Sequence, residues 1–203
     1  MEEREKPRIF GRIISWVFII ALIAILSVLF LRMCQQDYRA MEDITINDTF
    51  KSAYSESKDV RTHPVRDEFS ENGGFYAYSL YYIEEAGYVQ FCIRYNLNQL
   101  DSLKEKYPGF EDVCFVLRDS NDKEYTPTVL GEETKYNYVY IKLEYKFSEG
   151  EYSFKEDDLI ARMKIEGVDH DFDSEGLNDL IIHKKGEESV AYEFSKKELK
   201  ELE

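Results

Sequence analysis

One acidic segment, Asp169–Glu175, has the residue types that could coordinate a metal ion, with carboxylates at alternate positions. Such a spacing can wrap an oxygen-seeking cation such as calcium. An EF-hand loop, however, ends on a glutamate at its twelfth position. A loop that starts at Asp169 has Leu180 there, and one that starts at Asp171 has Ile182. We therefore predict a solvated acidic turn and no metal site, and cation binding by this turn stays open.

A second set of reactive residues matches the patterns of hydrolytic enzymes only in part. Ser55–Lys58 has the serine-x-x-lysine spacing of penicillin-binding enzymes, but the Ser-Asp-Asn and Lys-Thr-Gly elements that those enzymes also need are absent. The three histidines are isolated from one another: His63, His170 and His183. The sequence has no glycine-rich phosphate loop and no paired spacing of zinc ligands. It thus predicts no catalytic or cofactor-binding residue, and we expect that the protein is not an enzyme.

The 16 tyrosines are a further source of binding chemistry. Alternation puts Tyr76, Tyr78 and Tyr82 on one face of an expected strand, and Tyr138 and Tyr140 on another strand. Aromatic side chains on a flat sheet can stack on sugar rings or form a protein-docking patch. Cross-strand aromatic pairs also stabilise a sheet by about 0.2–1 kcal/mol each without any ligand, and we favour that role here.

The charge of the chain limits its partners. It has 26 Lys and Arg against 41 Asp and Glu, and the acidic excess lies after residue 36. A domain this acidic does not bind nucleic acid through the phosphates and is repelled by anionic lipid headgroups. Solubility is the simplest role of this charge, and a cationic partner or a divalent cation is the functional alternative.

Ile13–Leu31 is a run of 19 residues without a charge, and we expect it to cross the lipid bilayer. As a helix it spans roughly 28 Å, close to the ~30 Å hydrocarbon core of a membrane. A cleaved signal peptide has a shorter apolar run that ends on small residues. Here Arg32 and Met33 precede Cys34, which argues against both cleavage and lipid attachment. The segment is therefore predicted to be an uncleaved anchor.

The basic residues around this anchor predict its orientation. Four lie before it and two follow it closely: Arg4, Lys6, Arg8 and Arg12, then Arg32 and Arg39. The side that is richer in Lys and Arg stays in the cytoplasm. The expected single-pass protein of the cell membrane has a cytoplasmic tail (1–12), a transmembrane helix (13–31), a juxtamembrane stalk (32–74) and an exported, extracytoplasmic domain (75–203).

The cysteine content gives little information about the fold of the expected exported domain. Three of them, Cys34, Cys92 and Cys114, are too few for a disulfide-stabilised scaffold. This low content fits a bacterial envelope better than the secretory pathway of a multicellular organism. Cys92 and Cys114 could pair if their strands were neighbours, and the sequence leaves this open.

From Phe75 onward, apolar and polar residues alternate, which is the pattern of β-strands. The longest alternations run over Tyr88–Leu97, Tyr138–Phe147 and Leu159–Glu166, with the odd-numbered side chains expected in the core. Shorter candidates are Phe75–Ile83, Val113–Arg118, Tyr125–Leu130, Leu180–His183 and Val190–Phe194. Short strands joined mostly by tight turns predict an antiparallel β-sandwich.

Two short helices are expected to interrupt this pattern. Ser102–Glu105 and Ser195–Glu198 each have the spacing of a capping box, in which a serine opens a helix and a glutamate follows three residues later. Pro108 ends the first of these helices after about two turns. A weak helical pattern over Ile44–Tyr54 also suggests that part of the stalk is ordered.

With one anchor, a polar stalk and a strand-rich acidic domain, the chain resembles uncharacterised single-pass surface proteins of Gram-positive bacteria. Val89–Asn96, the helix after it and Phe115–Tyr125 are similar to the immunoglobulin-like exported domains of such proteins. The resemblance implies an immunoglobulin-like β-sandwich and carries no catalytic residue.

Two functional classes follow from these observations. The first is a membrane-anchored extracytoplasmic domain that binds or scaffolds another protein at the cell surface. The alternative is a cell-envelope enzyme or a sugar-binding module that acts on wall polymer. The lack of a recognisable nucleophile or metal set favours the first class. The identity of the partner and the oligomeric state stay open.

Overall fold

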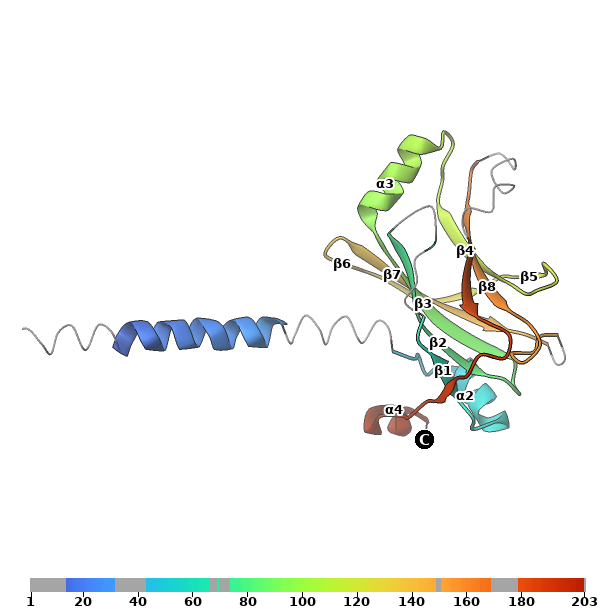
Figure 1. Ribbon diagram of the computed structural model, residues 1–203, viewed down its shortest axis with the longest axis horizontal. Helices are drawn as coiled ribbons and strands as arrows, with labels where there is room; N and C mark the ends of the chain where they lie inside the picture. The colour runs from blue at the N-terminus through green and yellow to red at the C-terminus, as the bar shows by residue number, and fades with distance from the viewer. Residues whose placement is uncertain are drawn as a thin grey trace, which may run out of the picture. The chain divides into compact units, whose positions relative to one another are not determined.

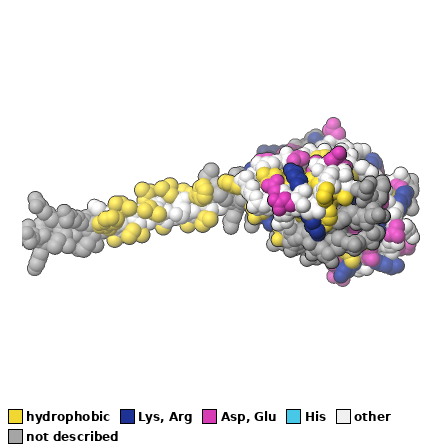
Figure 2. Space-filling model, turned by 90° about the horizontal axis from the view of Figure 1, so that it is seen from above, with side chains coloured by type: hydrophobic (Ala, Val, Ile, Leu, Met, Phe, Trp, Pro, Cys, Tyr) yellow, Lys and Arg dark blue, Asp and Glu magenta, His cyan; other side chains and the backbone are white. Residues whose placement is uncertain are grey.

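The structure, a computed structural model, describes residues 14–31, 43–65, 69, 74–148, 151–168 and 179–202. The chain divides into two compact units, Met1–Met41 and Glu42–Glu203. In the first unit the apolar run forms an α-helix over Ile14–Leu31. Hydrophobic side chains cover most of this helix along its length (Figure 2), and none of it is buried within the protein.

The length of this helix agrees with the expected anchor. Its 18 residues extend about 27 Å at a rise of ~1.5 Å per residue. A helix of this length and composition near the N-terminus can be a membrane span or a signal sequence. The first residue of the predicted span, Ile13, and the predicted cytoplasmic tail lie outside the described residues.

The second unit is built on two antiparallel sheets (Figure 1). Sheet A has six strands in the order β10-β1-β2-β3-β7-β6, and sheet B has four in the order β5-β4-β8-β9. The strands of sheet A are β1 (Arg61–His63), β2 (Phe75–Ile83), β3 (Tyr88–Asn96), β6 (Thr128–Lys135), β7 (Tyr138–Lys146) and β10 (Val190–Ala191). The strands of sheet B are β4 (Val113–Arg118), β5 (Glu124–Tyr125), β8 (Leu159–Ile165) and β9 (Asp179–His183). The prediction of a mainly β fold with antiparallel sheets is confirmed.

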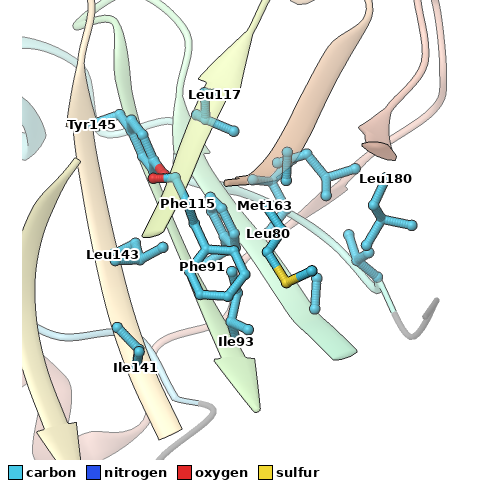
Figure 3. Packing of buried hydrophobic residues seen from close by; sticks show 14 of the residues in the cluster. Leu80, Phe91, Ile93, Phe115, Leu117, Ile141, Leu143, Tyr145, Met163 and Leu180 are labelled. Carbon is cyan, nitrogen blue, oxygen red and sulfur yellow. The ribbon is translucent and has the colours of Figure 1, made fainter. Parts of the chain in front are cut away.

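The hydrophobic core lies between the inner faces of the two sheets (Figure 3). Successive side chains of a strand point to opposite faces, so one face collects every second residue. In β3 and β7 the inner face holds the odd-numbered residues: Val89, Phe91, Ile93 and Tyr95, and Val139, Ile141, Leu143 and Tyr145. Sheet B faces them with Phe115, Leu117, Ala161 and Met163. The core positions predicted for β3 and β7 are therefore confirmed.

The predicted tyrosine face of β2 is wrong at one position. Tyr76 and Tyr78 share a face, but the pairing of β2 with β3 shifts register between Tyr78 and Tyr81. Ser79 has a φ of +21° at this irregularity. The extra residue reverses the alternation that follows. Tyr82 consequently belongs to the inner core and is 4% exposed.

The alternation also misjudged the chain between β4 and β7. It predicts one strand over Tyr125–Leu130, whereas the chain forms β5 in sheet B and β6 in sheet A. Pro127 lies between the two strands, and its missing backbone N–H cannot join a sheet ladder. The mostly exposed β6 pairs with β7 as an antiparallel neighbour, and this pairing rather than any apolar pattern forms the strand.

The folded unit begins earlier in the sequence than the predicted boundary at residue 75. Helix α2 (Asp48–Glu56) packs on the outer face of sheet A, where Phe50 and Ala53 are fully buried. The next segment contributes strand β1, which pairs with β2. The described residues of the predicted stalk (43–65, 69 and 74) are thus part of the domain, because their apolar side chains belong to the core between the sheets and to the cluster on the outer face of sheet A. Residues 32–42 lie outside the described residues.

The two predicted capping boxes have different outcomes. Helix α4 (Lys196–Leu202) begins as expected: the Ser195 backbone N–H donates to Glu198 Oε2 at 2.6 Å, and the Glu198 N–H donates to Ser195 Oγ at 3.3 Å. Helix α3 (Leu97–Lys106) begins earlier than expected, with Asn96 as its N-cap. Ser102 lies inside α3, where its hydroxyl donates to the Asn98 carbonyl. The box at Ser102 was therefore wrong.

Candidate functional site

A cleft with a volume of about 690 Å³ lies beside β1, β2 and β9. Four stretches that are far apart in the sequence line it: residues 57–61, 82–85, 154–155 and 183–189. Its volume falls within the range of roughly 300–1,000 Å³ that is typical of pockets for small ligands. The cleft therefore has the size of a binding site for a small molecule or for a few side chains of a partner.

Aromatic rings form one wall of this cleft. The register shift in β2 turns Tyr82 inward, where its ring stacks on Phe154 with the centroids 3.9 Å apart. His183, at the end of β9, meets both rings edge-on, at 5.2 Å from Phe154 and 5.8 Å from Tyr82. The three rings pack against one another, so the histidine is held in a fixed orientation.

His183 is the most unusual residue of the cleft. It is 1% exposed, and neither of its ring nitrogens has a hydrogen-bond partner among the described residues. A neutral imidazole carries one donor and one acceptor, and leaving such groups buried without a partner costs about 1–3 kcal/mol. Burial lowers the pKa of His183 from its usual value, and the neighbouring Glu187 opposes this effect in part. The side chain is thus a neutral group whose hydrogen-bonding capacity is unused.

Charged side chains form the rim of the cleft. Five carboxylates and two cations line it: Asp59, Glu84, Glu85, Glu187 and Glu188, with Arg61 and Lys155. Arg61 Nε lies 3.0 Å from Asp59 Oδ2, and Lys155 Nζ lies 3.9 Å from Glu84 Oε1. Both cations therefore already have a carboxylate neighbour, and the rim keeps an excess of negative charge.

A second, smaller cavity of about 320 Å³ lies between the two sheets. Its lining includes Tyr95, Phe115, Val139 and Leu143, which all belong to the hydrophobic core. Exposed polar residues complete the lining (Asp112, Glu132 and Thr134), and none of the buried polar atoms that have no partner among the described residues belongs to it. We therefore regard the cleft around His183 as the candidate functional site.

The outward tyrosines gather around an arginine. The Arg94 guanidinium carbon lies 5.3, 5.0 and 5.0 Å from the ring centroids of Tyr76, Tyr78 and Tyr138. Cation–π contacts of this kind stabilise a fold by about 0.5–2 kcal/mol. Tyr140 lies on the same face but is fully buried. Tyr76, Tyr78 and Tyr138 therefore pack around Arg94, and the role of this face in stabilising the sheet stays a prediction.

The structure brings together two of the three histidines singled out in the sequence. The rings of His63 and His183 are 6.3 Å apart and nearly perpendicular, and His63 Nε2 lies 3.3 Å from Glu187 Oε1. His170 and the acidic segment 169–175 lie outside the described residues. Among the residues that are described, no group of three His, Cys, Asp or Glu side chains could hold a metal ion.

Ser55, Cys92 and Cys114, the serine and cysteines singled out in the sequence, do not line the cleft. The Ser55 hydroxyl is exposed and donates to the Ser52 carbonyl one turn earlier in α2. Cys92 and Cys114 lie on strands of different sheets and form no disulfide with each other. Burial and the charge of Glu166 raise the pKa of the Cys114 thiol to about 11, so it is protonated and weakly nucleophilic at neutral pH.

Sequence reasoning missed the cleft as a site. His183 was singled out as an isolated histidine, whereas Tyr82 was expected on the outward face and Phe154 was not considered. The signal that was available is the cluster of charges around residues 184–188, which follows directly after a strand that ends in histidine. Comparison with known proteins adds no relative: no family model, no curated protein and no solved structure matches this chain.

Proposed function

We propose that this protein is a non-enzymatic binding domain, held at a membrane by its N-terminal helix, that contacts a partner protein through the cleft around His183. The observation that carries the proposal is a cleft of about 690 Å³ that ends on a buried side chain, whose two ring nitrogens have no hydrogen-bond partner within the described residues. A binding partner that reaches this side chain offsets the cost of leaving it without hydrogen bonds. The same charged and aromatic groups are available for contact without any chemical step.

The membrane location and the family resemblance belong to this proposal. The four-to-two distribution of basic residues around the apolar helix supports a cytoplasmic N-terminus and an extracytoplasmic domain. An immunoglobulin-like class, as in single-pass surface proteins of Gram-positive bacteria, stays a prediction. A sugar-binding module is the alternative, since aromatic rings beside carboxylates also suit carbohydrate. The charge of the rim favours a protein partner, because a lysine or arginine side chain brings the positive charge that an excess of carboxylates attracts, whereas a neutral sugar does not.

Site-specific photo-crosslinking tests the location of the binding site. A photo-reactive amino acid at Lys155, an exposed residue on the rim of the cleft, should give a discrete protein adduct in intact cells. The same amino acid at Glu133, on the exposed strand β6, is the matched control and should give none. The adduct should disappear when His183→Phe is added to the Lys155 probe. Equal adducts from both positions, or none from the cleft, would contradict the proposal.

Protease accessibility tests the predicted topology. Protease added to intact cells should digest the chain beyond Arg32 and leave a short membrane-embedded fragment that contains Ile14–Leu31. A tag placed before residue 12 should stay protected until the cells are lysed. Release of the intact domain into the medium would show instead that the helix is a cleaved signal sequence.

A further inference from the structure

We infer that the cleft around His183 binds a basic segment of a protein, whose lysine or arginine side chain enters between Glu85 and Glu188 and reaches the aromatic wall. This inference rests on the proposed function, because it names the chemistry of the partner that the same cleft would take. Three features carry it: the uncompensated charge of the rim, the neutral histidine below it and the volume of the cleft.

The charge of the rim selects the sign of the ligand. Arg61 and Lys155 are engaged by Asp59 and Glu84. Glu85 and Glu188 have no hydrogen-bond or ion-pair partner in the part of the chain that the structure describes. Carboxylates that converge on one cleft repel an anionic ligand and attract a cation, and complementary charge raises both the rate and the specificity of association.

The floor of the cleft suits a ligand group that donates hydrogen bonds better than it suits an anionic group. Burial keeps His183 neutral, so the floor of the cleft has no positive charge that would repel a cation, and a small shift of the covering side chains would let one ring nitrogen accept a hydrogen bond from an ammonium or guanidinium N–H. His63 and Glu187 face this ring and already interact with each other at 3.3 Å. The aromatic wall adds apolar surface for the methylene groups of a long basic side chain. A lysine or arginine side chain matches both parts of the cleft at once.

A bare divalent cation is a weaker match to the same site. The described residues of the cleft include no group of three ligands that could coordinate a metal ion. A long organic cation needs only the charge of the rim and one acceptor at the floor. The volume of about 690 Å³ therefore favours a side chain over a single ion.

Titration of the full-length protein in nonionic detergent with fluorescent hexalysine and hexaglutamate peptides tests the inference. Hexalysine should bind and hexaglutamate should not. The variant Glu85→Gln/Glu188→Gln should weaken hexalysine binding about fivefold or more, given the usual strength of exposed ion pairs. The matched variant Glu132→Gln/Glu133→Gln removes the same charge from β6 and should change the affinity by less than about twofold. His183→Phe, which keeps a ring but removes both nitrogens, should weaken binding about tenfold.

The outcomes separate this inference from the proposed function. Equal losses in the two double glutamine variants would show that hexalysine binds the acidic surface as a whole, and would overturn the inference. The two double variants change only exposed side chains, so they answer the question even if His183→Phe does not fold. If the Lys155 crosslink forms in cells but excess hexalysine does not suppress it, the binding site stands and the basic ligand is wrong. If no crosslink forms from the cleft, the proposed function itself fails.

Discussion

The two faces of sheet A are buried in different ways. The inner face meets sheet B through apolar and aromatic side chains, among them Phe91 and Leu143. The outer face is covered by residues 43–60 and by the C-terminal segment, and it mixes an aromatic cluster with buried polar groups. On that face Phe50 of α2 meets Tyr88 of β3 edge-on, with the ring centroids 5.4 Å apart.

A hydrogen-bonded network joins the outer cover to the sheet. Gln90 accepts from the Thr45 backbone N–H at 2.6 Å and donates to the Thr45 carbonyl at 3.2 Å, so its side chain acts like a neighbouring strand. Glu144 accepts from Tyr88 Oη and from Asn47 Nδ2, each at 2.9 Å. Burial, together with the charge of Glu144, raises the pKa of Tyr88, which keeps its hydroxyl a donor. The inner face is thus held by close packing of apolar side chains, and the outer face by specific hydrogen bonds as well.

This difference indicates that residues 43–56, which follow the apolar helix in the sequence, are held on the domain by a small hydrophobic cluster and a few specific hydrogen bonds. The inner core joins the two sheets, so loss of one of its large side chains should lower the stability of the whole domain. The outer network contains few contacts, so loss of one should release residues 43–56 before the sandwich itself unfolds.

Phe91→Ala should have the largest effect, a loss of about 3–5 kcal/mol in the free energy of unfolding. Phe91 is 2% exposed and stacks on Tyr145 with the centroids 5.6 Å apart. Urea unfolding of the full-length protein in detergent measures the loss, and Phe91→Leu should lose less because more of the volume is kept. Loss of less than about 1 kcal/mol would mean that β3 does not face sheet B as described.

Gln90→Ala should have an intermediate effect of about 1–3 kcal/mol, because it leaves the Thr45 backbone groups without partners. Hydrogen exchange should show faster opening of residues 43–56, while β3 and β7 stay protected. Lys146→Ala, an exposed change on the neighbouring strand β7, is the control and should cost within about 0.5 kcal/mol. Uniform acceleration over the whole domain would contradict a separately held outer cover.

The smallest effect should be the pH dependence of the free energy of unfolding that arises from His183 in the cleft. Because burial lowers the pKa of His183, the unfolded chain binds more protons than the folded chain below about pH 6.5. Stability should therefore fall as the pH drops through and below that value, by at most about 1.4 kcal/mol per pH unit for one proton. His183→Phe should remove this part of the slope in urea titrations at pH 7.5 and pH 5. An unchanged slope would mean that His183 is not the neutral buried group described here.

Much of the architecture follows from local patterns. The alternation over Tyr88–Leu97 and Tyr138–Phe147 marks two central strands, since side chains of a strand point to opposite faces in turn. The charge-free run before Arg32 marks the apolar helix through its length alone. Ser195–Glu198 marks the start of α4, because a capping box involves four successive residues and no distant contact.

Other features depend on contacts between distant residues and have no local signature. The bulge at Ser79 turns Tyr82 inward because of its pairing with β3. Residues 43–65 join the domain because they cover a face of sheet A that the alternation alone marks as outward. The cleft exists because β1, β2 and β9 converge and bring residues 57–61 and 183–189 together. Such long-range packing sets which polar groups become buried, and so the candidate site emerges only when the chain is folded.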